Sequence, residues 1–132
     1  MIIGYILAPT LEAKYTIEAL QQAISHAGSG NLCGTIHHSD RGVQYCCDEY
    51  ITLLKEHHIR ISMTEDSNPT DNGMAERVNG IIKNEFLEPL QTPKNLLEAL
   101  PLVDHAVRTY NTLRPHLSLN MRTPAQVYEE NK

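Results

Sequence analysis

The stretch that decides the fold is residues 33–63, CGTIHHSDRGVQYCCDEYITLLKEHHIRISM. It begins with a candidate strand at residues 33–38, which a polar turn at residues 40–42 ends. Apolar residues then recur at helical spacing through residues 46–57, and residues 59–63 alternate between apolar and polar like a short strand. A strand, a helix and a second strand in this order predict a parallel pair joined by a helical crossover.

Further elements extend on both sides of this stretch. Residues 1–7, MIIGYIL, are apolar and rich in β-branched side chains and end before a proline, which predicts another strand. The remaining expected elements are helices at 11–26, 74–86 and 95–109, a polar loop at 64–73, a kink or division at Pro101, and loops and turns over 110–128. Alternating strands and helices predict an α/β fold.

Length and composition place the chain among globular proteins. It has 132 residues, 41% of them hydrophobic and 20% charged, which suits one domain with an apolar core. No run approaches the roughly 20 apolar residues of a membrane helix, so we expect no membrane partner. The formal net charge of -5 argues by itself against DNA as a partner, because phosphate binding depends on clustered lysines and arginines.

Cysteine and histidine residues leave a different class of function open. The three cysteines are an odd number and no secretory segment opens the chain, so we expect a cytoplasmic protein. Five residues within fifteen positions could bind zinc, namely Cys33, His37, His38, Cys46 and Cys47. Their spacing does not follow the paired patterns of structural zinc sites. A metal-binding module unrelated to DNA stays a competing interpretation, and packed Cys and His side chains are the simpler one.

Two carboxylates are candidates for a magnesium site. Asp40 follows a predicted strand, and α/β sheets collect ligands at the carboxyl ends of their strands. Glu76 falls early in the predicted helix 74–86, and Mg²⁺ often takes one or two carboxylates together with substrate phosphates. The residues that share the helix face of Glu76 are Asn72, Asn79, Gly80 and Lys83. This polar stripe is either a solvated helix face or the lining of a cleft in which Lys83 contacts a phosphate.

Five ordered motifs carry a resemblance to a known family. Residues 38–45, HSDRGVQY, resemble the H-S-D-x-G-x-Q-Y motif of bacterial insertion-sequence transposases, which are related to retroviral integrases. Residues 71–80, DNGMAERVNG, resemble that family's D-N-x-x-x-E-x-x-N segment, and Lys83 matches its basic residue seven positions after the Glu. Residues 110–116, YNTLRPH, and 123–125, TPA, resemble its two closing motifs.

The resemblance implies a ribonuclease-H-like, integrase-core fold with a D-D-E metal site. Thirty-five residues separate Asp40 from Glu76, which is the family's spacing between its second Asp and its Glu. In this family Mg²⁺ or Mn²⁺ ions assist the cleavage and joining of DNA strands at transposon ends, so the resemblance implies that Asp40 and Glu76 are metal ligands. The other site residues that it implies are Lys83, Asn72 and Asn79, near the DNA end, and Arg114 and His116, which either face DNA or are structural.

The chain departs from the family pattern before its first motif. The family's first catalytic Asp precedes the second by several tens of residues, whereas Asp40 is the first Asp here. The earlier acids, Glu12 and Glu18, fall on a predicted helix. Because residues 1–7 align with the family's third strand, residues 1–132 are interpreted as a partial catalytic core that lacks the first strands of the sheet. We therefore expect the chain by itself to be inactive in strand transfer.

The expected partners are DNA, as transposon ends and target, and further copies of the chain. Exposed sheet edges invite pairing with another chain, which predicts a homo-oligomer. An alternative to the catalytic fragment is a non-catalytic remnant that binds full-length transposase and inhibits it. Bound metal ions would reverse the local field, so the charge of -5 predicts weak DNA binding without metal rather than none. The family implies a location at the bacterial nucleoid within the cytoplasm.

Overall fold

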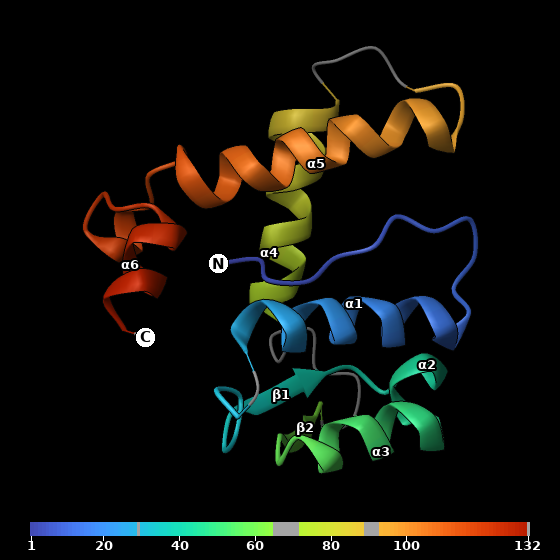
Figure 1. The fold of residues 1–132 in the computed structure, drawn as a ribbon. Helices are drawn as coiled ribbons and strands as arrows, with labels where there is room; N and C mark the ends of the chain where they lie inside the picture. Colours follow the sequence, from blue (N-terminus) through green and yellow to red (C-terminus); the bar gives the residue numbers. More distant parts are fainter. Residues whose placement is uncertain (29, 65–71, 89–92, 132) are drawn as a thin grey trace. The chain divides into compact units, whose positions relative to one another are not determined.

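A computed structural model describes residues 1–28, 30–64, 72–88 and 93–131 (Figure 1). Most of the expected loop 64–73, including Asp71, lies outside these described residues. The chain divides into two compact units, an amino-terminal unit, Ile3–Glu76, and a carboxyl-terminal unit formed by Met1–Ile2 and Arg77–Lys132, and each is described by itself. Among the described helices, none combines the length and apolar character that a membrane crossing requires.

The amino-terminal unit is built on a parallel pair of strands. In this unit the elements are α1 (Ala13–Ala27), β1 (Ile36–Ser39), α2 (Val43–Cys46), α3 (Asp48–Glu56) and β2 (Arg60–Met63). Ile36 of β1 lies opposite Arg60, and Ser39 lies opposite Met63. The predicted strand, helix and strand of residues 33–63 are confirmed, except that the single helix expected at 46–57 is two helices. Cys47 separates them because its backbone is extended, at φ -71° and ψ 147°.

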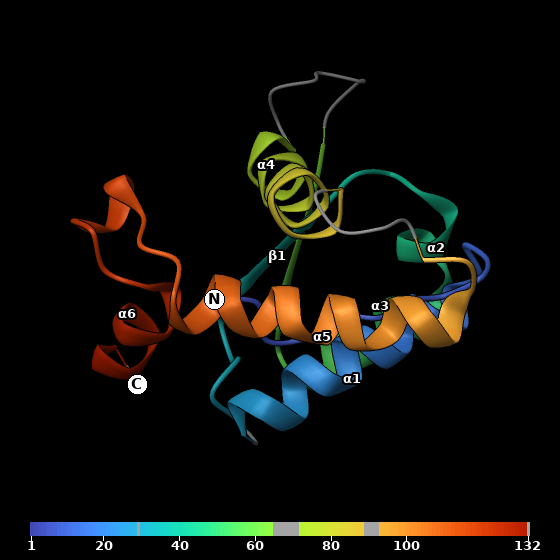
Figure 2. The ribbon, with the colours of Figure 1, turned by 90° about the horizontal axis from the view of Figure 1, so that it is seen from above.

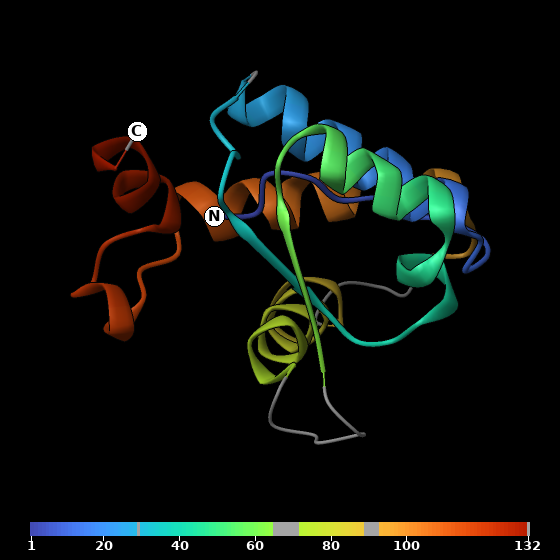
Figure 3. The ribbon, with the colours of Figure 1, turned by 90° about the horizontal axis from the view of Figure 1, so that it is seen from below.

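Apolar side chains from two helices form the core of this unit. Ile17 and Leu20 of α1 meet Tyr50 and Leu54 of α3, and Ile59 closes the cluster just before β2. Figure 3 shows α1 and α3 side by side, as their contacts require. Leu54 is 1% exposed, and burying a leucine side chain fully contributes about 2 kcal/mol of stability. The helices of this core therefore fix the sheet pair from one side.

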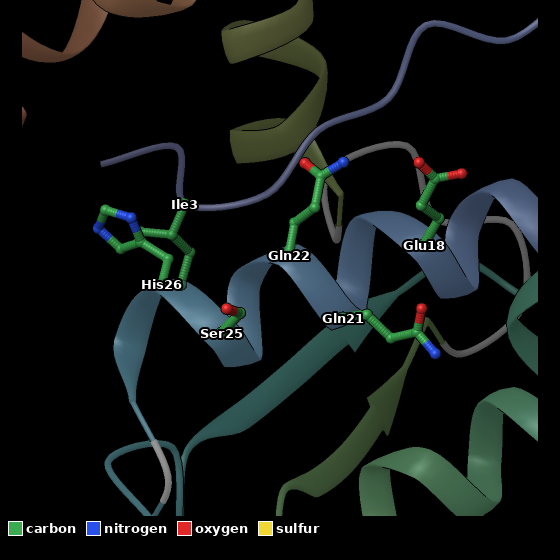
Figure 4. Close-up of a pocket in the computed structure, with 6 residues that line it drawn as sticks. All are labelled: Ile3, Glu18, Gln21, Gln22, Ser25 and His26. Carbon is green, nitrogen blue, oxygen red and sulfur yellow. The ribbon is translucent and has the colours of Figure 1, made fainter.

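The strand expected at residues 1–7 is wrong. In the structure this segment has no strand assignment, and its backbone bonds to side chains instead of to a neighbouring strand. The Tyr5 N–H donates to Gln22 Oε1 of α1 at 3.4 Å, and Figure 4 shows the Gln22 side chain extending from α1 toward this segment. Gly4 lies so close to α1 that an added Cβ would be 2.2 Å from the Ala19 carbonyl oxygen. Its apolar, β-branched sequence satisfies the composition of a strand, but a strand also needs a ladder partner.

The carboxyl-terminal unit is helical. Its elements are the end of α4 (Gly73–Ile81), a π-helical segment η1 (Ile82–Leu87), α5 (Leu96–Thr112), a 3₁₀ turn η2 (Leu117–Leu119) and α6 (Pro124–Glu130). The η1 segment packs against α5, and Figures 1 and 2 show the two crossing. The Asn111 side chain clamps Ile2, with Oδ1 accepting from the Ile2 N–H at 2.9 Å and Nδ2 donating to the Ile2 carbonyl at 2.8 Å.

Two expectations for this unit need correction. Pro101 does not divide the helix, because α5 continues through it from its cap at Asn95, whose side chain accepts from the Glu98 N–H. Residues 110–128 do not form loops and turns alone, because α5 extends to Thr112, η2 follows, and α6 begins at Pro124. Thr123 starts α6 by accepting from the Gln126 N–H, while the Gln126 side chain accepts from the Thr123 N–H. This reciprocal capping stabilises a short helix.

Candidate catalytic site

Asp40 stands at the carboxyl end of β1 with its carboxylate exposed. Its Oδ1 accepts a hydrogen bond from the Gly42 N–H at 2.9 Å, which is an Asx turn that fixes the carboxylate relative to the strand. A Cβ on residue 42 would lie 2.9 Å from the same Oδ1 and 2.7 Å from Gln44 Nε2, so a larger residue there would displace these two side chains. The sequence Asp40-Arg41-Gly42 therefore presents one carboxylate oxygen outward while a backbone donor holds the other.

The ends of the two strands are tied to each other at this point. The Thr64 N–H donates to the Ser39 carbonyl at 3.0 Å, which extends the parallel ladder by one residue. The Arg41 side chain then reaches across, with Nε donating to the Thr64 carbonyl at 2.9 Å. The backbone of Ser39 and the side chain of Arg41, the two neighbours of Asp40 in the chain, are therefore both bonded to Thr64 at the end of β2.

Three aromatic rings pack behind β1. His37 Nε2 lies 2.9 Å from the Tyr50 hydroxyl, and the two rings meet edge to face at 5.5 Å. Tyr45 meets Tyr50 in the same way at 5.6 Å. Burial raises the pKa of Tyr50 to about 12, with smaller contributions from Tyr45 and Cys47, and burial lowers the pKa of His37. Burial also raises the pKa of Tyr45, and the negative charge of Asp40 raises it further. The cluster is therefore neutral packing that supports the strand.

Glu76 lies in the first turn of α4. Its N–H donates to the Asn72 carbonyl at 3.1 Å, so Asn72 stands one turn earlier at the start of the helix. The Glu76 side chain is exposed, and a carboxylate is favoured in a first turn by the helix dipole. Asp40 and Glu76 belong to the same unit, and the segment that joins β2 to α4 includes residues 65–71, which lie outside the described part of the chain.

The polar stripe that follows Glu76 runs from an α-helix into a π-helix. Asn79 and Gly80 are in α4, as predicted, but Lys83 falls in η1. The Glu88 N–H donates to the Lys83 carbonyl at 2.8 Å, five residues back, as a π-helix requires. Lys83 Nζ lies 3.8 Å from Glu88 Oε1, and both side chains are exposed. The sequence spacing gave no sign of this change of helix type.

Arg114 and His116 are brought together in the carboxyl-terminal unit. Arg114 Nε and Nη2 each donate to Glu85 at 2.7 Å, to Oε2 and Oε1 respectively. Arg114 Nη1 lies 3.3 Å from His116 Nδ1, and the His116 ring meets Tyr110 edge to face at 4.9 Å. The hydrogen bonds from Arg114 hold the pKa of Glu85 below its usual range, and burial followed by the Arg114 charge lowers the pKa of His116. Sequence reasoning missed Glu85, because no motif marks it and twenty-nine positions separate it from its partner.

The carboxylates of Asp40 and Glu76 are the candidate ligands for a metal ion. Over the described residues no three His, Cys, Asp or Glu side chains form a ligand group. Two exposed carboxylates suit the oxygen preference of Mg²⁺, which completes its coordination with water and phosphate. Three of the five possible zinc ligands have other contacts: His38 Nδ1 lies 2.9 Å from Ser62 Oγ, Cys47 Sγ bonds to the Gln44 carbonyl at 3.4 Å, and Cys46 Sγ lies 3.9 Å from Met63 Sδ. The donor chemistry fits a hard divalent cation held by few protein ligands.

Several known proteins resemble this chain in sequence. A transposase for insertion element IS629 of Shigella sonnei is 35% identical over 86 residues, which are 65% of this chain and 28% of the relative. A 31 kDa protein of element IS600, also from Shigella sonnei, is 31% identical over 130 residues, which are 98% of this chain and 47% of the relative. The chain therefore spans less than half the length of either of these curated relatives.

Solved integrase structures share the fold. The catalytic core domain of HTLV-2 integrase superposes with a TM-score of 0.65 at 29% identity and covers 87% of this chain and 68% of that one. The catalytic core of BIV integrase superposes with a TM-score of 0.70 at 22% identity and covers 96% of this chain and 76% of that one. The fold is therefore that of integrase catalytic cores, which is ribonuclease-H-like. Residues 57–124 match the integrase core domain family, and the chain belongs to that family.

Proposed function

We propose that the chain works in a transposase catalytic core that cleaves and joins DNA strands, with Asp40 and Glu76 as ligands of a divalent metal ion. The observation that carries this proposal is the exposed Asp40 carboxylate, held by the Gly42 N–H at the carboxyl end of β1 in an integrase-type fold. Two relatives support it, since one is named as a transposase and the HTLV-2 integrase core was solved in complex with magnesium.

Each residue of the site has a task that its surroundings suit. A bound Mg²⁺ or Mn²⁺ ion supplies Lewis-acid stabilisation of the phosphodiester oxygens. Asp40, whose carboxylate accepts from the Gly42 N–H, would hold the ion, and Glu76 would add a second carboxylate from the first turn of α4. Lys83 contacts a DNA phosphate as a cation. The two amides, Asn72 and Asn79, orient the DNA end through neutral hydrogen bonds.

The polypeptide of residues 1–132, tested by itself, is expected to have no strand-transfer activity. Asp40 is its first aspartate, so it brings two carboxylates to chemistry that the D-D-E site performs with three. Two carboxylates hold a cation weakly, because each lost ligand removes one charge-assisted contact to the metal. The same observation favours a second candidate function, in which the chain associates with a longer transposase and inhibits it.

Association with another copy is the proposed route to such a complex. Residues 37 and 39 of β1 face β2 along the ladder, so the backbone groups of Ile36 and His38 point to the opposite edge. Unpaired edges of this kind recruit strands from other chains. We expect the chain to form a homo-oligomer, and the HTLV-2 integrase core was solved in a trimeric form. A monomer mass that does not change with concentration, measured by light scattering, would contradict this expectation.

The test of the metal site uses Mn²⁺ binding and DNA nicking in parallel. Paramagnetic resonance or calorimetry should detect weak Mn²⁺ binding to the wild-type chain, and Asp40→Asn or Glu76→Gln should each remove it. Asp48→Asn is the matched control, because Asp48 is an exposed acid of α3 in the same unit. Binding that survives both site substitutions would overturn the assignment of Asp40 and Glu76.

The activity arm separates the catalytic fragment from the non-catalytic partner. Supercoiled plasmid and a short duplex with a recessed end are incubated with the chain and Mn²⁺. We expect neither nicking nor joining above the level of the Glu76→Gln variant. Clear activity that Glu76→Gln abolishes would contradict the expected inactivity and would support the catalytic site directly. Adding the wild-type chain to an active longer relative then tests inhibition.

A further inference from the structure

The η1 segment needs an external support, because a π-helix is less favourable than an α-helix and is seldom longer than one turn. Here it runs for six residues, Ile82–Leu87, and continues α4 without a break. In the carboxyl-terminal unit it packs against α5, and Figure 2 shows the two helices crossing. Glu85 lies inside this segment. Its carboxylate accepts two short hydrogen bonds from the Arg114 guanidinium.

The Arg114–Glu85 pair is a two-point contact between elements. Both bonds measure 2.7 Å, and the Arg114 side chain is 26% exposed whereas that of Glu85 is 45% exposed. Arginine and carboxylate in this fork arrangement fix orientation as well as distance. Arg114 is itself well anchored, because its N–H donates to the Thr109 carbonyl at 2.9 Å at the end of α5 and Pro115 stops the helix there.

His116 contacts the third guanidinium nitrogen of Arg114. Its Nδ1 lies 3.3 Å from Arg114 Nη1, and its ring stands against Tyr110. The backbone of His116 is fixed too, since its N–H donates to the Arg122 carbonyl at 3.1 Å. The Nε–Nη2 fork of Arg114, the side that suits two-point recognition of a carboxylate or phosphate, is thus taken by Glu85 inside the unit, and Nη1 faces His116.

The helix type at η1 decides where Lys83 presents its charge. In an α-helix, residues five positions apart point roughly 140° away from each other. The Lys83–Glu88 ion pair is possible because the π-helix brings such residues over one another. If residues 82–87 returned to α-helical form, Lys83 would lose this neighbour and rotate relative to α5. Lys83 is two residues from Glu85, so the Arg114 contact lies in the same π-helical segment as Lys83.

We propose that Arg114 and Glu85 are positioning residues, whose two-point contact keeps residues 82–87 in π-helical form and thereby sets where Lys83 meets DNA. The contact to DNA rests on the function proposed above, whereas the support of η1 does not. Of the two roles that the sequence left open for Arg114, this arrangement favours the structural one. Arg114 therefore affects DNA through Lys83 and not by touching it.

The experiment combines DNA affinity with hydrogen exchange on the chain of residues 1–132. Fluorescence anisotropy with a labelled duplex at low salt gives the affinity, and mass spectrometry follows exchange of the η1 amides. We expect Glu85→Gln and Arg114→Lys each to weaken binding about threefold to tenfold and to speed exchange in η1, as loss of one phosphate contact would. The exchanged pair, Glu85→Arg with Arg114→Glu, should restore both readouts. Arg108→Ala, at an exposed arginine of α5, is the matched control for charge.

Three outcomes would overturn the proposal. If Arg114 touches DNA itself, Glu85→Gln leaves binding unchanged or tightens it, and the exchanged pair stays weak. If the pair only adds stability, the variants unfold earlier but bind DNA normally at temperatures where circular dichroism shows them folded. If exchange in η1 is unchanged in every variant, the pair does not support the π-helix. A wild-type chain that fails to bind DNA refutes the proposed function, and the exchange measurement still decides the role of the pair.

Discussion

Gly4 is the residue at which the amino-terminal segment passes closest to α1. We expect Gly4→Ala to lower the free energy of unfolding by at least about 2 kcal/mol. The added Cβ would lie 2.2 Å from the Ala19 carbonyl oxygen, and a backbone atom inside a helix cannot move away without distorting the helix. Gly80→Ala is the matched opposite. No atom lies within 4 Å of its added Cβ among the described residues, and it sits inside α4. It should raise stability by about 1 kcal/mol. Urea unfolding measures both, and equal effects would contradict the close approach.

Two histidines give the fold a pH dependence of known sign. Burial lowers the pKa of His37 and of His116 below the ordinary 6.5, so both are neutral in the folded chain at pH values where the unfolded chain takes up protons. Stability is therefore complete above about pH 6.5 and falls as the pH drops from there toward the lowered folded values. Glu85 affects stability in a different pH range. Because its pKa is lowered in the folded chain, its contribution to stability is lost only as the pH falls below about 4.5.

Chemical unfolding at about pH 7.5 and about pH 5.5 measures this dependence. His37→Gln and His116→Gln should each reduce the difference in unfolding free energy between the two conditions. His105→Gln, at an exposed position of α5, serves as the control and should leave it unchanged. A chain that is equally stable at both pH values would show that neither histidine is buried in neutral form.

The Thr123 cap determines whether α6 forms. Removing its side-chain acceptor with Thr123→Ala leaves an amide of the first turn without a partner, which costs about 1 kcal/mol. We expect faster hydrogen exchange in residues 124–130 and little change elsewhere. Thr112→Ala is a suitable control, because that hydroxyl donates back to the Arg108 carbonyl and caps no helix start. Unchanged exchange in α6 would mean that packing against α5, and not the cap, holds this helix.

Sequence could predict those elements whose signals are local. The β1 and β2 strands followed from alternation and turn residues, and α1 and α5 followed from apolar spacing. The strand predicted at residues 1–7 was wrong, because a β-strand requires hydrogen bonds to a neighbouring strand and not only a β-branched composition. Thr123 and Gln126 carried a readable capping signal for α6 that was overlooked. The π-helix could not have been predicted, because its support comes from Arg114, far along the chain.

The candidate site divides in the same way. Its turn chemistry was open to prediction, because Asp40 and Gly42 interact over two positions and follow a strand. The place of Glu76 in a first turn was also readable from helical spacing. The ion-pair partners could not be predicted. Glu85 pairs with Arg114, which is far along the chain, and Glu88 reaches Lys83 because the helix between them is π-helical. The pairing of Asp40 with Glu76 across a metal ion stays a prediction.

At the scale of the whole molecule, the charge distribution determines what DNA binding we expect. Residues 105–122 contain three arginines and no acid, yet Arg114 is bonded to Glu85 and Arg122 to Glu130. Acidic residues outside this stretch therefore neutralise two of its three arginines, and the net charge of the chain is -5. We expect weak DNA binding whose salt dependence corresponds to no more than about three phosphate contacts.

Anisotropy titrations over a range of salt concentrations measure that slope. Adding Mn²⁺ should strengthen binding several-fold in the wild-type chain and not in Asp40→Asn, because the ion reverses the local field only where it is held. A steep salt dependence without metal would indicate a cationic surface that the described residues do not provide. Equal strengthening in both chains would point to ions that bind the DNA alone.

The aromatic cluster of His37, Tyr45 and Tyr50 also provides a spectroscopic probe of the site. With six tyrosines and no tryptophan, its near-ultraviolet signal comes almost wholly from phenol rings, and Tyr45 and Tyr50 are held edge to face. Burial, and then the charge of Asp40, raises the pKa of Tyr45. A cation bound at Asp40 would cancel that charge beside the Tyr45 ring. We therefore expect Mn²⁺ at neutral pH to change the near-ultraviolet signal of the wild-type chain and not that of Asp40→Asn, without any label.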